Sequence, residues 1–166
     1  MRHLWAPWRL TYITGPKTEG CVFCQAIALG DDRTVLVLHR SSHGFLILNR
    51  FPYNTGHLMV VPYRHVARLE GLSSEEAEAL MALTDFAVRL LEHVMVPQGF
   101  NIGMNLGRSA GAGIDDHLHM HVVPRWVGDT NYMPVLGDVK VMPEHLEQTY
   151  DRLAAGLAAV PERPRR

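Results

Sequence analysis

The sequence predicts an α+β fold with a mainly antiparallel sheet of about five strands, one long helix and a C-terminal helix. Short β-type runs follow one another along the chain, and only one long amphipathic helix is inserted among them. This order is typical of α+β folds rather than of alternating α/β folds. The chain has 166 residues, of which 47% are hydrophobic and 20% are charged. That length and composition indicate a single globular domain and exclude global disorder.

The first part of the chain is expected to form an arm, a short helix and three strands. The arm, residues 1–20, carries Trp5, Trp8 and Tyr12 among prolines and is expected to be irregular. A short helix is expected over Cys21–Leu29. The three strand-like runs that follow are separated by turn residues: Thr34–His39, Gly44–Leu48 and His57–Val61.

The long helix has the clearest signals in the sequence. Ser73 and Glu76 form a capping box, and apolar residues then recur at helical spacing to about Val94, before Pro97. Two further strands, Phe100–Asn105 and His117–Val123, precede a C-terminal helix over Leu146–Leu157. We expect an arm at 1–20, a main domain at 21–135, and a C-terminal helix with a frayed tail at 136–166.

Charge and hydropathy argue against two classes of partner. The 16 Lys and Arg residues nearly balance 17 Asp and Glu residues, for a net charge of −1. The chain therefore lacks the positive field that attracts nucleic acid. No apolar run approaches the roughly 18 residues of a membrane span, and the start of the chain lacks the apolar core of a signal peptide. We expect a cytoplasmic protein that binds neither nucleic acid nor membrane.

Three alternating histidines, His117, His119 and His121, are the central chemical signal. Alternate side chains of a strand share a face, so the three imidazoles are expected on one surface and their apolar neighbours in the core. A purely structural role would need a separate hydrogen-bond partner for each ring. Neutral histidine binds metals, attacks phosphorus and transfers protons near neutral pH. The preceding Gly-rich loop, Gly107–Gly113, offers backbone N–H groups to an anion and favours phosphate chemistry.

A second cluster begins at Cys21 and Cys24, which have the spacing of a zinc-binding pair. The chain has no other Cys, so a tetrahedral site would need two histidines, for which His65 and His117 are the candidates. The alternatives are a redox pair and two buried thiols without metal. A thioredoxin-like pair is disfavoured because no βαβ pattern follows it.

At this point the sequence resembles the histidine triad (HIT) superfamily of nucleotide hydrolases and transferases. The segment His117–Val123 fits the family signature of three histidines separated by apolar residues. Leu48-Asn49-Arg50, Gly56–Pro62 with His65, and Asn101–Gly107 resemble the family's other segments. The flanks, Leu4–Arg9 and Pro124–Pro134, resemble the bacterial branch related to diadenosine tetraphosphate phosphorylases. The resemblance implies a HIT-like fold.

The resemblance also implies roles for single residues. His119 matches the nucleophile, and His121 matches the residue that contacts the phosphate and the bridging oxygen. His117 matches the fourth zinc ligand, completing the set Cys21, Cys24, His65 and His117. Asn49 matches a ribose-binding residue and Asn105 a residue that contacts the phosphates.

Phosphate donors just before the triad depart from the family pattern. Many members have Ser or Thr there, whereas this chain has Gly111-Ala112-Gly113. The phosphate is then expected to rely on backbone N–H groups around Gly111 and Gly113, or on Ser109. Trp126, just past the strand, is expected either to stack on a base or to pack against the aromatic arm.

The expected reaction is cleavage of a dinucleoside polyphosphate such as diadenosine tetraphosphate through a nucleotidyl-histidine intermediate. The acceptor is left open between water and inorganic phosphate, and a homodimer with structural zinc is expected. One alternative is an adenosine phosphoramidase of the Hint type. A non-enzymatic alternative is a nucleotide-binding or sensor protein with a structural zinc. A nucleic-acid end-processing enzyme is disfavoured by the near-neutral charge.

Overall fold

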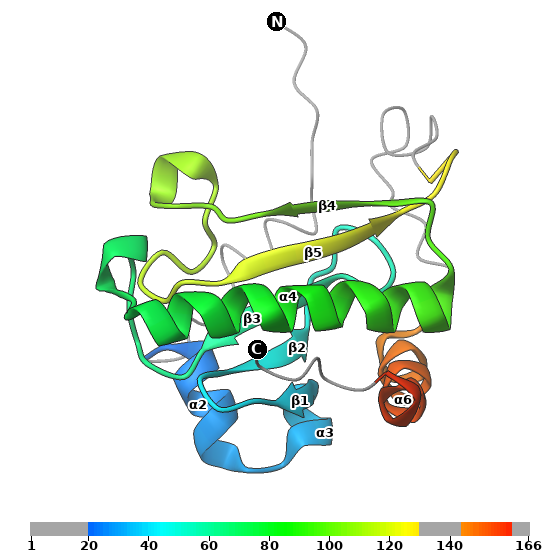
Figure 1. The fold of residues 1–166 in the computed structure, drawn as a ribbon, viewed down its shortest axis with the longest axis horizontal. Coiled ribbons are helices and arrows are strands. Elements are labelled where there is room, and N and C mark those ends of the chain that lie inside the picture. Colours follow the sequence, from blue (N-terminus) through cyan, green and yellow to red (C-terminus); the bar gives the residue numbers. More distant parts are fainter. Residues whose placement is uncertain (1–19, 130–143, 161–166) are drawn as a thin grey trace, which may run out of the picture.

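The computed structural model describes residues 20–129 and 144–160. Apart from Gly20, the predicted aromatic arm lies outside the described residues, as does the predicted frayed end at 161–166. Within the described part, five strands form one antiparallel sheet in the order β1-β2-β3-β5-β4 (Figure 1). The strands are β1 Val37–Arg40, β2 Gly44–Leu48, β3 Leu58–Pro62, β4 Gly99–Gly103 and β5 Met120–Arg125. The predicted α+β fold is therefore confirmed.

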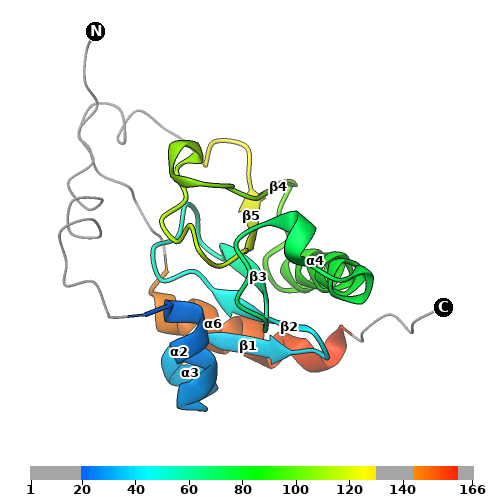
Figure 2. The same ribbon diagram turned by 90° about the vertical axis from the view of Figure 1, so that its left-hand side faces the viewer.

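Helices pack on both sides of this sheet. The long helix α4, Ser74–Met95, lies across one face of the sheet, and α2, Val22–Leu29, lies on the other side (Figures 1 and 2). The remaining helices are α3 Asp32–Val35 and α6 Leu146–Gly156, with short 3-10 turns η1 Leu69–Gly71, η2 Arg108–Ala110 and η3 Leu157–Ala159. No helix in the described ranges has both the length and the apolar character needed to cross a membrane.

Helix α4 begins where the capping box predicts. The Ser73 hydroxyl oxygen accepts from the Glu76 N–H at 3.2 Å, and a Glu76 carboxylate oxygen accepts from the Ser73 N–H at 2.7 Å. The two bonds satisfy backbone donors that a helix start leaves unpaired. One stripe of the helix is buried against the sheet and α6: Leu80, Leu83, Phe86, Ala87, Leu90 and Leu91.

The sheet register decides which side chains share a face with the triad. His121 in β5 pairs with Met59 of β3 on one side and with Gly103 of β4 on the other. Directly paired residues of antiparallel strands point to the same face. The neighbouring pair of Val122 and Leu58 therefore points to the opposite face, where both side chains are fully buried. The alternation of His and apolar residues thus separates the histidine face from the core.

The predicted strand Thr34–His39 is wrong in its first half. Residues Asp32–Val35 form helix α3, and the Asp31 side chain caps it by accepting from the backbone N–H and the hydroxyl of Thr34 at 3.2 Å and 2.7 Å. This local cap outweighs the β propensity of the run. Leu36 then adopts a left-handed φ of 66° and turns the chain into β1.

The predicted strand His117–Val123 also begins too early, because β5 starts at Met120. Upstream of Met120, the Leu118 N–H donates to the Val66 carbonyl, 2.6 Å away in the loop beyond β3. His117 and His119 therefore sit in an irregular segment that is held by single bonds rather than by the strand ladder. The other predicted strands and the C-terminal helix agree with the structure to within two residues at each end.

Candidate active site and metal-binding cluster

The rings of His119 and His121 lie side by side, and Phe23 of helix α2 packs against His117 and His119. The ring centroids of His119 and His121 are 4.9 Å apart. The Phe23 ring lies 5.4 Å from the His117 ring and 5.2 Å from the His119 ring. His117 and His119 are buried, while His121 is half-buried. The Phe23 ring thus links the first ring of the triad to the second.

His119 is held by a single bond that fixes its tautomer. Its Nδ1 lies 2.8 Å from the backbone carbonyl oxygen of His117. A carbonyl can only accept, so Nδ1 carries the proton and donates it to this bond. The Nε2 atom then carries the lone pair, and no described residue hydrogen-bonds to it. An imidazole in this state is poised to act as a nucleophile.

His121 is paired with a second histidine, His57, which is fully buried. The backbone N–H of Tyr53 donates to Nδ1 of His57 at 3.0 Å, and the Asn49 side-chain amide donates to the same atom at 3.2 Å. His57 must therefore carry its proton on Nε2, from which it donates to Nδ1 of His121 at 2.9 Å. The proton of His121 is left on Nε2. His119 and His121 thus present complementary atoms, a lone pair on one and an N–H on the other.

Burial keeps the triad neutral. It lowers the pKa of His117 and of His119, because a charged imidazolium loses its hydration there. The pKa of His121 falls to about 4, through burial first and through the nearby His119 second. All three rings are therefore uncharged at neutral pH. Neutral His119 carries an available lone pair without a deprotonation step, and the tautomers derived above apply to these uncharged rings.

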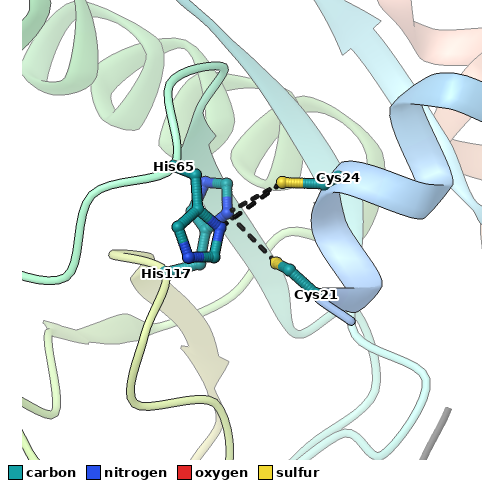
Figure 3. A group of neighbouring side chains, drawn as sticks. All are labelled: Cys21, Cys24, His65 and His117. Carbon is teal, nitrogen blue, oxygen red and sulfur yellow. Dashed lines mark hydrogen bonds between the residues drawn. The ribbon is translucent and has the colours of Figure 1, made fainter. Parts of the chain in front are cut away.

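A cluster of four side chains that could hold a metal ion, Cys21, Cys24, His65 and His117, includes the first histidine of the triad. Its four ligand atoms all lie within 4.8 Å of one another. Cys21 is the N-cap residue of α2 and Cys24 lies in its first turn, whereas His65 comes from the loop after β3 and His117 from the segment before β5 (Figure 3). The Nε2 of His117 donates to the Pro62 carbonyl at 2.9 Å, which leaves the Nδ1 lone pair facing the thiols.

The spacing of these atoms fits a tetrahedral zinc ion. With zinc–sulfur and zinc–nitrogen bonds of about 2.3 and 2.0–2.1 Å, a tetrahedral site separates sulfur from nitrogen by about 3.6 Å. The observed separations are 3.2 Å for Cys21 Sγ to His117 Nδ1, 3.7 Å for Cys24 Sγ to the same atom, and 3.5 Å for Cys24 Sγ to His65 Nδ1. Both cysteines are free thiols. Burial and the adjacent Cys21 raise the pKa of Cys24.

Comparison with known proteins identifies the family. The family model described as the HIT domain matches residues 32–127, more than half of the chain. This chain belongs to the HIT domain family. The match includes the complete triad. It also includes His57, the partner of His121, and His65, a member of the cysteine–histidine cluster. The family resemblance predicted from the sequence is therefore confirmed.

Three relatives of this HIT protein are informative. An AP-4-A phosphorylase from Mycobacterium tuberculosis is 42% identical over 170 residues, which cover 97% of this chain and 87% of the relative. An adenosine 5'-monophosphoramidase from Schizosaccharomyces pombe is 28% identical and covers 63% of this chain and 74% of its own length. Among solved structures, a Zn-bound histidine triad family protein from Mycobacterium smegmatis superimposes with a TM-score of 0.68 and 28% identity. That alignment covers 84% of this chain and 94% of the other.

The remaining predicted site residues of the HIT protein lie on two loops and a strand end. Asn49 lies beside the His57–His121 pair, where its side-chain oxygen accepts from the Phe51 N–H at 2.9 Å. Trp126 follows β5, and its indole N–H donates to the Val96 carbonyl at 3.2 Å. The others occupy the loop between β4 and β5, where Asn105 is half-buried and the following three are exposed: Ser109, Gly111 and Gly113.

Sequence reasoning missed four residues around the triad. Phe23 packs on two of the triad rings, and the Tyr53 ring lies 4.7 Å from His57 and 5.6 Å from His121. Asn54 and Asp129 link the loop before His57 to the end of β5, with 2.9 Å between the Asn54 amide nitrogen and the Asp129 carboxylate. The Asn54 turn signal was visible in the sequence. Its partner was not, because the two residues are 75 positions apart.

Proposed function

We propose that this HIT protein cleaves dinucleoside polyphosphates of the diadenosine tetraphosphate class by phosphorolysis, with His119 as the nucleophile. The observation that carries the proposal is the tautomer of His119, whose Nδ1–H is held by the His117 carbonyl at 2.8 Å so that its Nε2 lone pair is available. The AP-4-A phosphorylase of Mycobacterium tuberculosis, which aligns with 97% of the chain, supports the substrate class and phosphate as the acceptor.

The chemistry would proceed in two displacements. Nε2 of His119 attacks the α-phosphorus, and the bond to the bridging oxygen breaks with its electron pair going to that oxygen. The Nε2–H of His121 donates a hydrogen bond to the departing oxygen and stabilises the charge that develops there. Diadenosine tetraphosphate thus gives ATP and an AMP group on His119. Inorganic phosphate then attacks the same phosphorus, releasing His119 and forming ADP.

Neutral histidine suits this route. It brings no negative charge to a substrate that is already a polyanion, and its position is fixed before the substrate arrives. We propose that Asn49 binds the ribose of the attacked nucleotide. The β4–β5 loop would surround the phosphates with Asn105, Ser109 and the backbone at Gly111 and Gly113, and Trp126 would border the bound nucleotide.

We further propose that Cys21, Cys24, His65 and His117 bind one structural zinc ion. The sulfur–nitrogen distances of 3.2–3.7 Å support this ligand set. His117 would serve two purposes, because its side chain belongs to the cluster while its carbonyl oxygen orients His119. The ion would not touch the reacting atoms, and its contribution would be to hold α2 and the triad segment together.

We propose a homodimer that forms through strand β4. This strand ends the sheet, and residues Asn101–Gly103 are exposed in the described part of the chain. Ile102 is 47% exposed there. An apolar edge strand is a surface that pairs readily with another strand. Light scattering coupled to gel filtration should give twice the mass of one chain, and Ile102→Lys should shift the protein to monomers.

The test of the reaction is product identification from diadenosine tetraphosphate with and without inorganic phosphate. Phosphorolysis predicts ADP and ATP in equal amounts, formed only when phosphate is present. Formation of AMP and ATP without phosphate would instead identify a hydrolase. A parallel assay with an adenosine phosphoramidate tests the activity named for the Schizosaccharomyces pombe relative, and tight AMP binding without any turnover would favour the non-enzymatic sensor.

A further inference from the structure

The loop before His57 makes two hydrogen bonds to this histidine. The Tyr53 N–H donates to the His57 ring at Nδ1, and the Asn54 carbonyl accepts from the His57 backbone N–H at 3.1 Å. The first of these bonds helps to place the His57 proton on Nε2, and thereby the His121 proton on Nε2 as well. The state of His121 therefore depends on where the Tyr53–Asn54 turn sits.

The Asn54 side chain ties this turn to the strand that carries His121. Its amide nitrogen donates to the Pro124 carbonyl at 3.1 Å and to an Asp129 carboxylate oxygen at 2.9 Å. Pro124 belongs to β5, and Asp129 lies in the turn that follows it. The loop that contacts His57 is thus held to the strand that carries His121.

Asp129 is itself held firmly. Its side chain is 9% exposed, and it pairs in a bidentate fashion with Arg125 at 2.6 and 2.8 Å. It also accepts from the Trp126 N–H at 3.1 Å. The bidentate arginine holds both carboxylate oxygens of Asp129 in place, which makes this side chain a well-oriented acceptor.

We propose that Asn54 and Asp129 are positioning residues that set the proton of His121 on Nε2, where it can hydrogen-bond to the departing oxygen. The catalytic part of this inference rests on the proposed function, whereas the proton placement does not. Without the Asn54 amide, the Tyr53 N–H moves away from His57. His57 then keeps one donor at Nδ1 instead of two, and both histidines populate the opposite tautomers.

The first experiment reads the tautomers directly and needs no activity. Histidine-labelled protein is examined by ¹⁵N NMR as wild type, Asn54→Ala and Asp129→Asn. The wild type should show protonated Nε2 on both His57 and His121, and the two variants should show mixed tautomers. Asn101→Ala is the matched control, because it removes another bond to Arg125, of 2.6 Å, without touching the loop. Unchanged tautomers in Asn54→Ala, or a His121 proton on Nδ1 in the wild type, would overturn the proposal.

The second experiment compares two AMP aryl esters, one with the good leaving group 4-nitrophenol and one with the poor leaving group phenol. The poor leaving group develops more charge on oxygen and depends more on the His121 donor. Asn54→Ala should lower kcat about ten- to a hundredfold for the phenyl ester and much less for the nitrophenyl ester. An equal loss on both esters would contradict the positioning role. A wild type inert on both esters and on diadenosine tetraphosphate would refute the proposed function but leave the NMR result valid.

Discussion

The Nε2 atom of His57 lies 2.9 Å from the Nδ1 atom of His121. Because the Tyr53 N–H occupies the other ring nitrogen of His57, the bond has one direction, with His57 as the donor. A fully buried histidine that touches no substrate atom in the proposed mechanism thus determines which proton His121 can offer.

The loss of turnover on replacing His57 should therefore depend on whether the new side chain keeps a donor at the position of Nε2. The amide nitrogen of Gln occupies nearly the position of Nε2 and can still donate to His121, whereas the shorter Asn cannot reach. We expect His57→Asn to lower kcat about a hundredfold and His57→Gln to lose less than about tenfold. Steady-state kinetics, with circular dichroism as a check on folding, makes the comparison. Equal losses in both variants would show that donation to His121 is unimportant.

Replacing His119 should abolish turnover. His119→Asn removes the Nε2 lone pair, so no covalent intermediate can form. We expect activity to fall by at least about a thousandfold with the melting temperature little changed. Quenching the wild type with labelled substrate should trap an AMP adduct on the protein, and the variant should give none. Near-wild-type turnover by His119→Asn would refute the covalent route.

The acid side of the pH profile should lie below the usual range of histidine. Only neutral His119 can attack, and burial lowers its pKa, so protonation inactivates the enzyme at a lower pH than the ordinary value near 6.5. His121, with a pKa of about 4, stays neutral over the same range. The acid limb of kcat/KM should therefore lie below the ordinary histidine value. An acid limb centred at pH 6.5 or above would contradict this assignment.

Zinc should be recovered at about one ion per chain, as four ligands imply. Cys24→Ser should lose the metal, and a loss of about 3 kcal/mol of stability would lower the melting temperature by roughly 6–12 °C. The exposed His93, at the end of α4, gives a matched control, because His93→Gln should keep both metal and stability. A stable wild-type preparation without metal would rule out the structural zinc.

Substitutions at two glycines can distinguish backbone strain from steric crowding. Gly30 and Gly56 have positive φ values of 73° and 79°. A Cβ at Gly30 meets nothing within 4 Å, whereas one at Gly56 lies 2.5 Å from Met95 Sδ and 3.2 Å from Leu91 Cδ2.

We expect Gly30→Ala to cost about 1–2 kcal/mol from the left-handed conformation alone, and Gly56→Ala to cost about 1–3 kcal/mol more from overpacking. Urea unfolding of both variants measures the difference. Adding Met95→Ala to Gly56→Ala should recover part of it. Equal losses in the free energy of unfolding at the two glycines would mean that the side chains around Met95 move aside without destabilising the core.

The parts of the site that the sequence predicted are those with a short-range pattern. The spacing of His117, His119 and His121 predicted one shared face, and the rings of His119 and His121 do lie 4.9 Å apart, although His117 and His119 precede the strand. The cysteine pair and the absence of other cysteines pointed to His65 and His117, whose ligand atoms converge on the thiols. The capping box at Ser73 predicted the start of α4 for the same reason, because all its atoms lie within one turn.

The parts that escaped prediction depend on tertiary contacts or on single backbone angles. The Asn54–Asp129 bond joins distant loops and has no local signature. Leu36 adopts its left-handed φ although leucine carries no preference for it, so the switch from α3 to β1 could not be predicted. The Asp31 cap could have been found, since Asp is a preferred N-cap residue, but the β-branched residues that follow it favoured a strand.

At His121 and Val122, strand β5 is paired on both sides, with β3 and with β4. Backbone amides in such a central strand exchange with solvent only when the whole domain opens. The protein should therefore accommodate nucleotides of different polyphosphate length by adjusting its rim, chiefly the β4–β5 loop, while the backbone at His121 stays still. Deuterium uptake in the presence of nucleotide would then change at residues 105–116 and not at 120–125.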